Sequence, residues 1–173
     1  MKKILLGVLV SASIFACKNS ETKEIVTTEQ APATIEHIYK PTYTDNFKIG
    51  DQKNVLIAEQ MHQAIFAKDF KKIAEFLSDT VLFSMEDGTT IKGKEAGLAY
   101  MEKAFAGMNV KNYSMTGEVP IVGENGHQWV IMFDRAEVET PDGKTQTIEW
   151  VDSFRFLDGK VVHMNGYAKS PKQ

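Results

Sequence analysis

The sequence has one cysteine, few histidines, little excess of either charge and no long hydrophobic run. With Cys17 alone, no intrachain disulfide can form and a thiolate zinc site is not expected. The four histidines are scattered without a metal-ligand spacing, and no glycine-rich phosphate loop is present. The formal net charge is −3, so the composition does not indicate the basic surface that nucleic-acid binding requires. We therefore expect no metal, no cofactor and no nucleic-acid partner.

The first 17 residues have the order of an export signal. Lys2 and Lys3 precede an apolar run from 4 to 16, which is too short to span a bilayer, and Cys17 follows at once. This order resembles a bacterial lipoprotein signal, in which the cysteine is lipidated and becomes the mature N-terminus, although Phe15 stands where a small residue is usual. An ordinary secretory signal is the alternative. Either one predicts an exported protein, and the first predicts a lipid anchor in a bacterial membrane.

Composition divides the chain into three parts. Residues 1–16 form the expected signal peptide. Residues 17–49 hold the lipidated Cys17 and a stretch rich in Ser, Thr, Glu, Lys and Pro without sustained periodicity, which is typical of a flexible tether. Residues 50–173 alternate between helical and strand periods, and are long enough for one hydrophobic core. The sequence therefore predicts one folded domain behind a tether.

Three helices are predicted at the start of this domain. Asp51 is a plausible N-cap for the first, and Asp69 for the second, which should run to Leu77. Residues 94–108 have the apolar spacing of the third. The buried face of the first helix is predicted to hold Val55, Ala58, Met61, His62 and Ile65.

Period-two patterns dominate the rest of the domain. The predicted strands cover 80–85, 89–91, 110–118, 127–139, 145–156 and 161–168. Helices first and an antiparallel meander afterwards indicate an α+β fold, with the helices packed on one face of a curled sheet.

In the stretch 147–167, one polar residue lies on the otherwise apolar face of a predicted strand. Trp150, Asp152 and Phe154 alternate on one face of a strand, so a carboxyl group lies between two aromatic rings. Burial disfavours its charged form, and we expect Asp152 to donate a hydrogen bond as the neutral acid. An internal salt bridge, for instance to Arg135, is the alternative.

The turn after this strand carries a family resemblance. The sequence FRFLDGKV at 154–161 is similar to a signature of SnoaL-like and ketosteroid-isomerase-like members of the nuclear-transport-factor-2-like superfamily. The element order resembles the same superfamily from about 54 to 167. The resemblance implies a cystatin-like cone, with three N-terminal helices packed on a curved antiparallel sheet around a conical pocket.

The same resemblance implies roles for single residues. Asp152 matches the ketosteroid isomerase aspartic acid that donates a hydrogen bond in the oxyanion hole. The general-base position of those enzymes falls on Ser84 or Met85, and their oxyanion-hole tyrosine falls on about Met61. Neither position carries the required group, so steroid isomerase activity is not expected.

The pocket wall is predicted to be rich in methionine and aromatic residues, as suits an apolar small molecule. For each of these residues alone, a place in the core is the alternative. The predicted ligand-binding residues are Met61, Tyr100, Met101, Trp150, Phe154 and Met164, with Asp152 as the tentative catalytic residue.

Three functions remain open on the sequence. The first is a module that binds a small apolar molecule through Asp152. The second is an enzyme of proton transfer, hydration or cyclisation, which needs a second acid or base from Asp134, Tyr100 or His62. The third is an interaction domain with a cone filled by side chains. A homodimer through the convex sheet face is expected as well.

Overall fold

The computed structural model describes residues 36–44, 46–140 and 142–169. The chain divides between residues 38 and 39, and all helices and strands of the described residues belong to the unit that begins at Tyr39. The signal and the lipidation at Cys17 lie outside the described residues. Among the residues that are described, no helix is long and apolar enough to cross a membrane.

Three helices precede most of the sheet. They are α1 (Gln52–Phe66), α2 (Phe70–Phe76) and α3 (Lys94–Phe105). The Asp51 carboxylate accepts a hydrogen bond from the Lys53 backbone N–H at 2.9 Å, and Asp69 accepts one from Lys72 at 3.0 Å. Both predicted N-caps are therefore confirmed.

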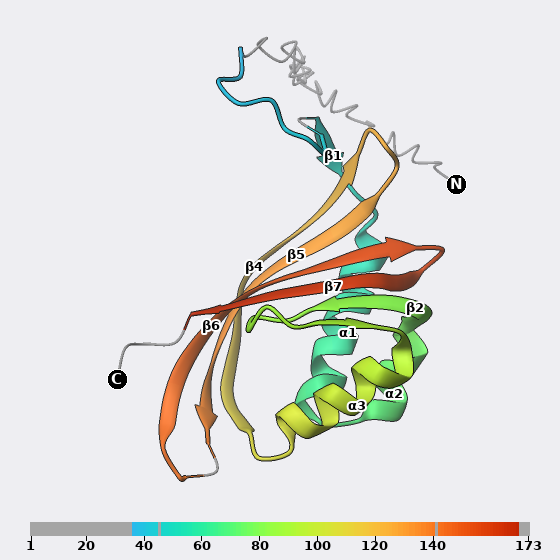
Figure 1. Ribbon diagram of the computed structural model, residues 1–173. Coiled ribbons are helices and arrows are strands. Elements are labelled where there is room, and N and C mark those ends of the chain that lie inside the picture. The colour runs from blue at the N-terminus through green and yellow to red at the C-terminus, as the bar shows by residue number, and fades with distance from the viewer. Residues whose placement is uncertain (1–35, 45, 141, 170–173) are drawn as a thin grey trace, which may run out of the picture. The chain divides into compact units, whose positions relative to one another are not determined.

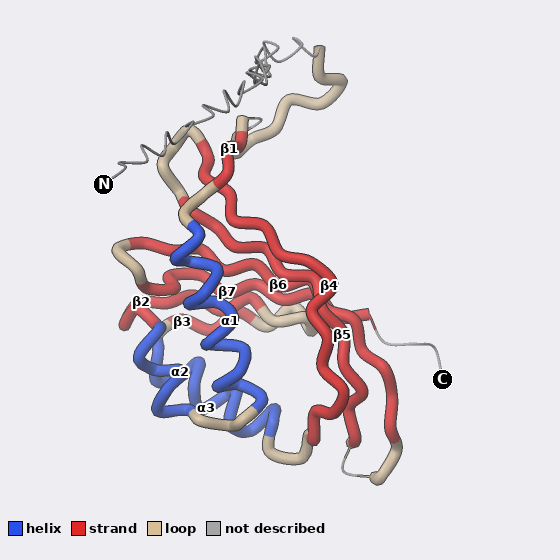
Figure 2. Tube along the Cα trace, turned by 180° about the vertical axis from the view of Figure 1, so that it is seen from behind, coloured by secondary structure: helices blue, strands red, loops and turns tan. Residues whose placement is uncertain are grey.

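A seven-stranded sheet makes up the rest of the unit, in the order β1-β4-β5-β6-β7-β2-β3. Strands β4 to β7 form a meander, and every pairing is antiparallel except that of β2 with β7. The sheet curls, and the three helices lie inside its curve (Figures 1 and 2). The α+β cone is thus confirmed, with one parallel pairing in a mostly antiparallel sheet. The strands are β1 (Phe47–Ile49), β2 (Leu77–Ser84), β3 (Thr90–Lys92), β4 (Asn109–Gly123), β5 (Gln128–Glu139), β6 (Thr145–Leu157) and β7 (Lys160–Lys169).

Two boundaries differ from the sequence prediction. Leu77 begins β2 instead of ending α2, because its backbone is extended and pairs with Val161 of β7. Strand β1 lies inside the segment expected to be a tether. It pairs with Gly123, Val122 and Ile121, because β4 runs five residues beyond its predicted end and offers unpaired backbone groups at its edge.

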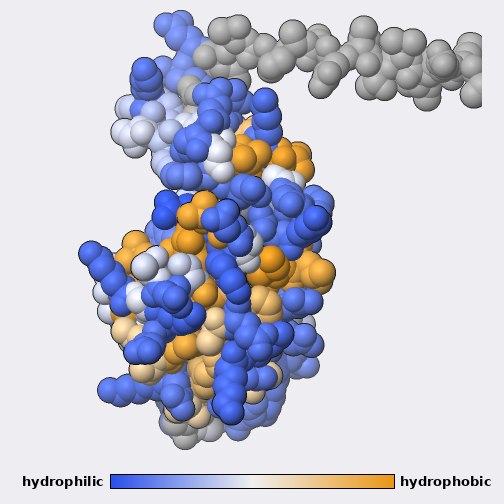
Figure 3. Space-filling model, turned by 90° about the vertical axis from the view of Figure 1, so that its right-hand side faces the viewer, coloured by the Kyte–Doolittle hydropathy of each residue, from blue (hydrophilic) through white to orange (hydrophobic). Residues whose placement is uncertain are grey.

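Alternation along β5 and β6 separates the two faces of the sheet. Val130, Met132, Asp134, Ala136 and Val138 are buried on the concave side, as are Ile148, Asp152, Phe154 and Phe156. The core lies between this face and the helices. On the side of the molecule seen in Figure 3, hydrophobic residues reach the surface in separate groups among hydrophilic ones.

Candidate functional site

A pocket of about 180 Å³ opens on the concave side of the sheet. Its walls come from α1, α3, the turn between β2 and β3, and the inner faces of β5, β6 and β7. Phe66, Phe105, Met101, Met164 and Trp150 contribute apolar surface. Side chains therefore do not fill the cone, in contrast to the third function left open by the sequence.

The polar part of the pocket is a histidine between two aspartates. His62 Nδ1 lies 3.2 Å from Asp134 Oδ2, and His62 Nε2 lies 3.2 Å from Asp152 Oδ2. The Asp134 side chain is fully buried, whereas 12 % of the Asp152 side chain is exposed. Of the two carboxylates, Asp152 is therefore the more accessible from the pocket.

Helix periodicity and strand register bring these three residues together. His62 lies on the buried face of α1, next to Met61 and one turn before Ile65. Asp134 pairs with Trp150 across the β5–β6 ladder, so Asp152 is its diagonal neighbour on the same face. Diagonal neighbours are about 7–8 Å apart, which leaves space for an imidazole ring between the two carboxylates.

The carboxylates determine the charge of the histidine. Burial alone lowers the pKa of His62, but the hydrogen bonds and negative charges of Asp134 and Asp152 outweigh burial and raise the pKa from 6.5 to about 9. At neutral pH the ring is an imidazolium that donates from both nitrogens. Asp152 is therefore an acceptor in this contact, whereas the sequence led us to expect a donor, and its partner is His62, not Arg135.

A tyrosine completes the buried side of the cluster. Tyr113 donates from its hydroxyl to Asp134 Oδ2 at 3.2 Å, and burial together with the Asp134 charge raises the pKa of Tyr113. Within the part of the chain that the structure describes, Asp134 Oδ1 is buried and has no hydrogen-bond partner. The cluster thus holds one carboxylate oxygen whose lost hydration no neighbour replaces.

Gly166 on β7 makes room for Asp152. A Cβ atom at this position would lie 2.7 Å from Asp152 Oδ1, which is closer than a side chain tolerates. The absence of a side chain at position 166 therefore leaves space for the Asp152 carboxylate beside β7, from where it contacts His62.

His62, Asp134 and Asp152 each offer one possible metal-ligand atom, and these atoms lie within 4.8 Å of one another. The arrangement does not suit a metal, because each carboxylate faces a different nitrogen and the ring itself lies between them. An imidazolium also has no free lone pair to give to a metal. The three residues fit a doubly paired imidazolium better than a metal centre.

The other predicted ligand-binding residues divide into two groups. Tyr100, Met101, Trp150 and Met164 line the pocket. Met61 and Phe154 are fully buried in the core, and the Phe154 ring packs edge-on against the His62 ring at 5.5 Å between centroids. These two residues therefore lie in the core behind the pocket wall and do not line the pocket.

The turn between β2 and β3 adds acidic side chains at the pocket that the sequence analysis did not predict. Glu86 and Asp87 both line the pocket, and Tyr100 donates to Asp87 Oδ2 at 3.3 Å. Burial, followed by the charges of Asp152 and Asp87, raises the pKa of Glu86. Only the presence of two acids before Gly88 could have indicated this role. Tyr113 and Gly166 gave no signal, because their contacts join distant strands.

Comparison with known families gives one match within this chain. The model of the SnoaL-like domain matches residues 58–164, a range that includes His62, Asp134 and Asp152. No curated protein matches the chain.

Solved structures share the fold at low sequence identity. An LEH-like epoxide hydrolase from M. tuberculosis superposes with a TM-score of 0.55 at 13% identity, covering 68% of this chain and 84% of its own. A candidate polyketide cyclase from Pseudomonas putida gives 0.53 at 18% identity, covering 66% and 90%. A candidate ketosteroid isomerase from Kribbella flavida gives 0.55 at 12% identity, covering 72% and 84%. At these identities the likeness establishes the fold alone.

Proposed function

Given that this chain belongs to the SnoaL-like domain family, we propose that its pocket binds a small, mainly apolar molecule and that Asp152 and His62 move a proton on it. The observation that carries this proposal is the convergence of two titratable side chains, 3.2 Å apart, at the wall of an open and largely apolar pocket.

The two residues have different roles in this proposal. Asp152 is the more exposed carboxylate, so it accepts a proton from the bound molecule or from a water held beside it. The imidazolium of His62 lies directly behind Asp152 and stabilises negative charge that develops near it. Asp134 holds the ring in orientation through Nδ1 and keeps it protonated. Related solved structures include proteins described as a hydrolase, a cyclase and an isomerase, so the reaction is proposed only as acid–base chemistry.

Binding without catalysis is the second candidate. One observation favours it: both nitrogens of His62 already face carboxylates, so His62 has no free N–H to donate to the ligand in a second step. In that case Asp152 anchors a hydrogen-bonding group of the ligand, and the apolar walls hold the rest.

One experiment separates the two candidates. The protein is incubated with small apolar ketones, enones and epoxides in D₂O or in water labelled with heavy oxygen, and the products are analysed by mass spectrometry. Proton transfer incorporates deuterium next to a carbonyl, and hydration incorporates the heavy oxygen. We expect label incorporation to fall by about a hundredfold or more in Asp152→Asn, in line with loss of a general base.

Binding is measured in parallel by calorimetry. Binding without any label incorporation would support the second candidate, a site that binds without catalysis. Arg135→Gln is the control, because this residue lies on the outer face of the same strand as Asp134 and does not line the pocket.

We also propose that the protein is exported and lipid-anchored through Cys17. The order of charged, apolar and cysteine residues at 1–17 supports this proposal. Growth of the expressing bacterium with labelled palmitate should label the wild-type protein and move it to the membrane fraction. Cys17→Ser should lose both the label and the membrane association. An equally labelled Cys17→Ser protein would contradict the anchor.

A further inference from the structure

Four acidic side chains lie at this largely apolar pocket. Asp134, Asp152, Glu86 and Asp87 line it, and the only cationic side chain among its lining residues is that of His62. Since that imidazolium is shared by Asp134 and Asp152, the two acids of the β2–β3 turn have no positive partner in the pocket. The lining therefore carries a surplus of negative charge.

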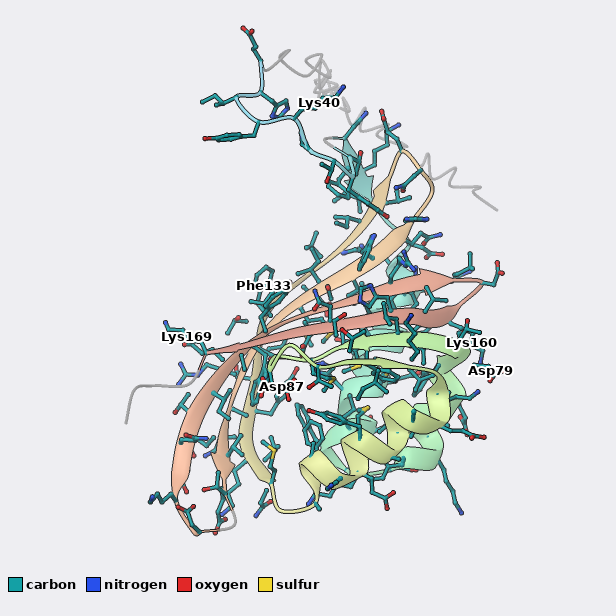
Figure 4. The ribbon with its side chains drawn as sticks, viewed as in Figure 1. Lys40, Asp79, Asp87, Phe133, Lys160 and Lys169 are labelled. Atoms are coloured by element: carbon teal, nitrogen blue, oxygen red, sulfur yellow. The ribbon has the colours of Figure 1, made fainter. Side chains whose placement is uncertain are left out.

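The turn acids are held in place by their own contacts. The Asp87 Oδ1 atom accepts the Thr89 backbone N–H at 2.8 Å, and its Oδ2 atom accepts the Tyr100 hydroxyl. These hydrogen bonds lower the pKa of Asp87 and keep it ionised. Figure 4 shows Asp87 at the opposite end of β2 from Asp79. The two carboxylates differ in surroundings, because Asp79 pairs with Lys94, whereas no ion pair joins Asp87 to any residue that the structure describes.

A second observation is independent of the turn. Asp134 Oδ1 is buried without a hydrogen-bond partner among the described residues, and Asp134 lines the same pocket. A buried carboxylate oxygen without a partner and a glutamate whose neighbours Asp152 and Asp87 carry like charge both incur an electrostatic cost, which a nearby cation would relieve. Trp150, Phe66 and Phe105 line the same cavity, and aromatic rings attract cations.

We infer that the natural ligand of this pocket is a small apolar amine, protonated at neutral pH, whose ammonium group is held by the acids of the turn while its apolar body lies against the aromatic walls. This inference rests on the proposed function, since it names the class of molecule that the same pocket takes. A neutral molecule of the same shape fills the apolar part but leaves the acids unpaired, and an anionic one is repelled by them.

The test compares phenethylamine with its isosteric alcohol, phenylethanol, and with phenylpropionate, by calorimetry on the full folded unit. The amine is expected to bind at least about tenfold more tightly than the alcohol, with the preference decreasing at high salt. Glu86→Gln and Asp87→Asn should each reduce that preference by several fold while leaving alcohol binding unchanged. Asp158→Asn is the matched control. It removes the same charge from a turn outside the pocket, at a residue whose positive φ of 50° asparagine also adopts.

The outcomes separate this inference from the proposed function. Equal affinity for amine and alcohol, or a preference that Asp158→Asn reduces as much as Glu86→Gln does, overturns the amine inference and leaves the apolar site intact. If none of the three compounds binds, the proposed function is contradicted along with it. Circular dichroism and thermal unfolding of each variant establish that the turn substitutions leave the fold in place.

Discussion

At the scale of single residues, the cluster of His62, Asp134 and Asp152 is the decisive feature. An isolated buried histidine would be neutral, because burial disfavours its charged form. Two carboxylates at 3.2 Å reverse this preference and raise the pKa of His62 to about 9. The charge state of one side chain therefore depends on two carboxylates that follow it in the sequence by more than 70 residues.

This charge state predicts how stability depends on pH. The pKa of His62 is higher in the folded state than its ordinary value of 6.5, so its contribution is complete below about pH 6.5 and is lost as pH rises through about 9. The expected loss is on the order of 3 kcal/mol in the free energy of unfolding. Urea unfolding between about pH 6 and about pH 9.5 measures it.

His62→Gln is the control for this prediction. Glutamine cannot titrate, so the difference between the two proteins isolates the histidine from other groups that titrate in the same range. Parallel pH curves for wild type and His62→Gln would contradict a raised pKa. Titration of His62 by NMR gives the same answer directly.

Gly166 supplies a second prediction at this scale. In Gly166→Ala the new methyl group displaces the Asp152 carboxylate, which lies at the end of a flexible side chain and can rotate away. Stability should fall by about 1 kcal/mol or less, but the pKa of His62 should decrease because one of its two partners moves off. Gly117→Ala is the control, since its Cβ atom would lie 3.9 Å from Phe133 in ordinary contact. An unchanged His62 titration in Gly166→Ala would show that Asp152 keeps its place.

At the scale of elements, close packing of α3 on β2 sets one wall of the pocket. Gly97 lies on the buried side of α3, and a Cβ atom there would lie 1.9 Å from the Phe83 ring. Phe83 itself is fully buried. The helix that carries Tyr100 and Met101 can approach the sheet this closely only because position 97 has no side chain.

Gly97→Ala should therefore destabilise the fold. On an exposed helix position this change stabilises by up to about 1 kcal/mol, whereas overpacking at Gly97 should cost about 1–3 kcal/mol. The sign of the change in the urea midpoint decides between the two effects. Adding Phe83→Leu to Gly97→Ala should recover part of the loss. If the effects of the two substitutions on the free energy of unfolding were fully additive, residues 83 and 97 would not be in contact.

The elements also show where sequence reasoning succeeds. Periodicity and caps are local properties, so α1, α2 and the alternation of β5 and β6 follow from the sequence. Strand β1 could not be predicted from the sequence, because its pairing depends on the free edge of β4, about 75 residues away. The concave position of Asp152 follows from alternation alone, but its partner His62 depends on how α1 crosses the sheet.

At the scale of the whole molecule, the outer face of the sheet carries a hydrophobic row. Phe133 pairs with Val151, and Val151 with Tyr167, so the three lie side by side on β5, β6 and β7. They are 42%, 38% and 63% exposed, and Figure 4 shows Phe133 on the side of the sheet away from the helices. A contiguous exposed row of this kind is typical of an interaction surface.

We expect a homodimer through this face, measured by analytical ultracentrifugation. Phe133→Glu should shift the protein toward the monomer, because a charge in the centre of an apolar interface is costly to bury. Leu157→Glu is the control, since Leu157 is also exposed but lies at the end of β6, outside the row. A wild-type protein that sediments as a monomer would contradict this expectation.

The sequence by itself determined most element types, the caps of α1 and α2, the two faces of the sheet and the family resemblance, because hydrophobic periodicity, turn residues and short motifs act over a few neighbouring positions. Only the tertiary structure decided that His62 lies between Asp134 and Asp152, that Gly166 makes room for a carboxylate and that two turn acids face an apolar pocket. Those relations join residues tens of positions apart. They are electrostatic and steric interactions, which arise only when the strands and α1 have packed together.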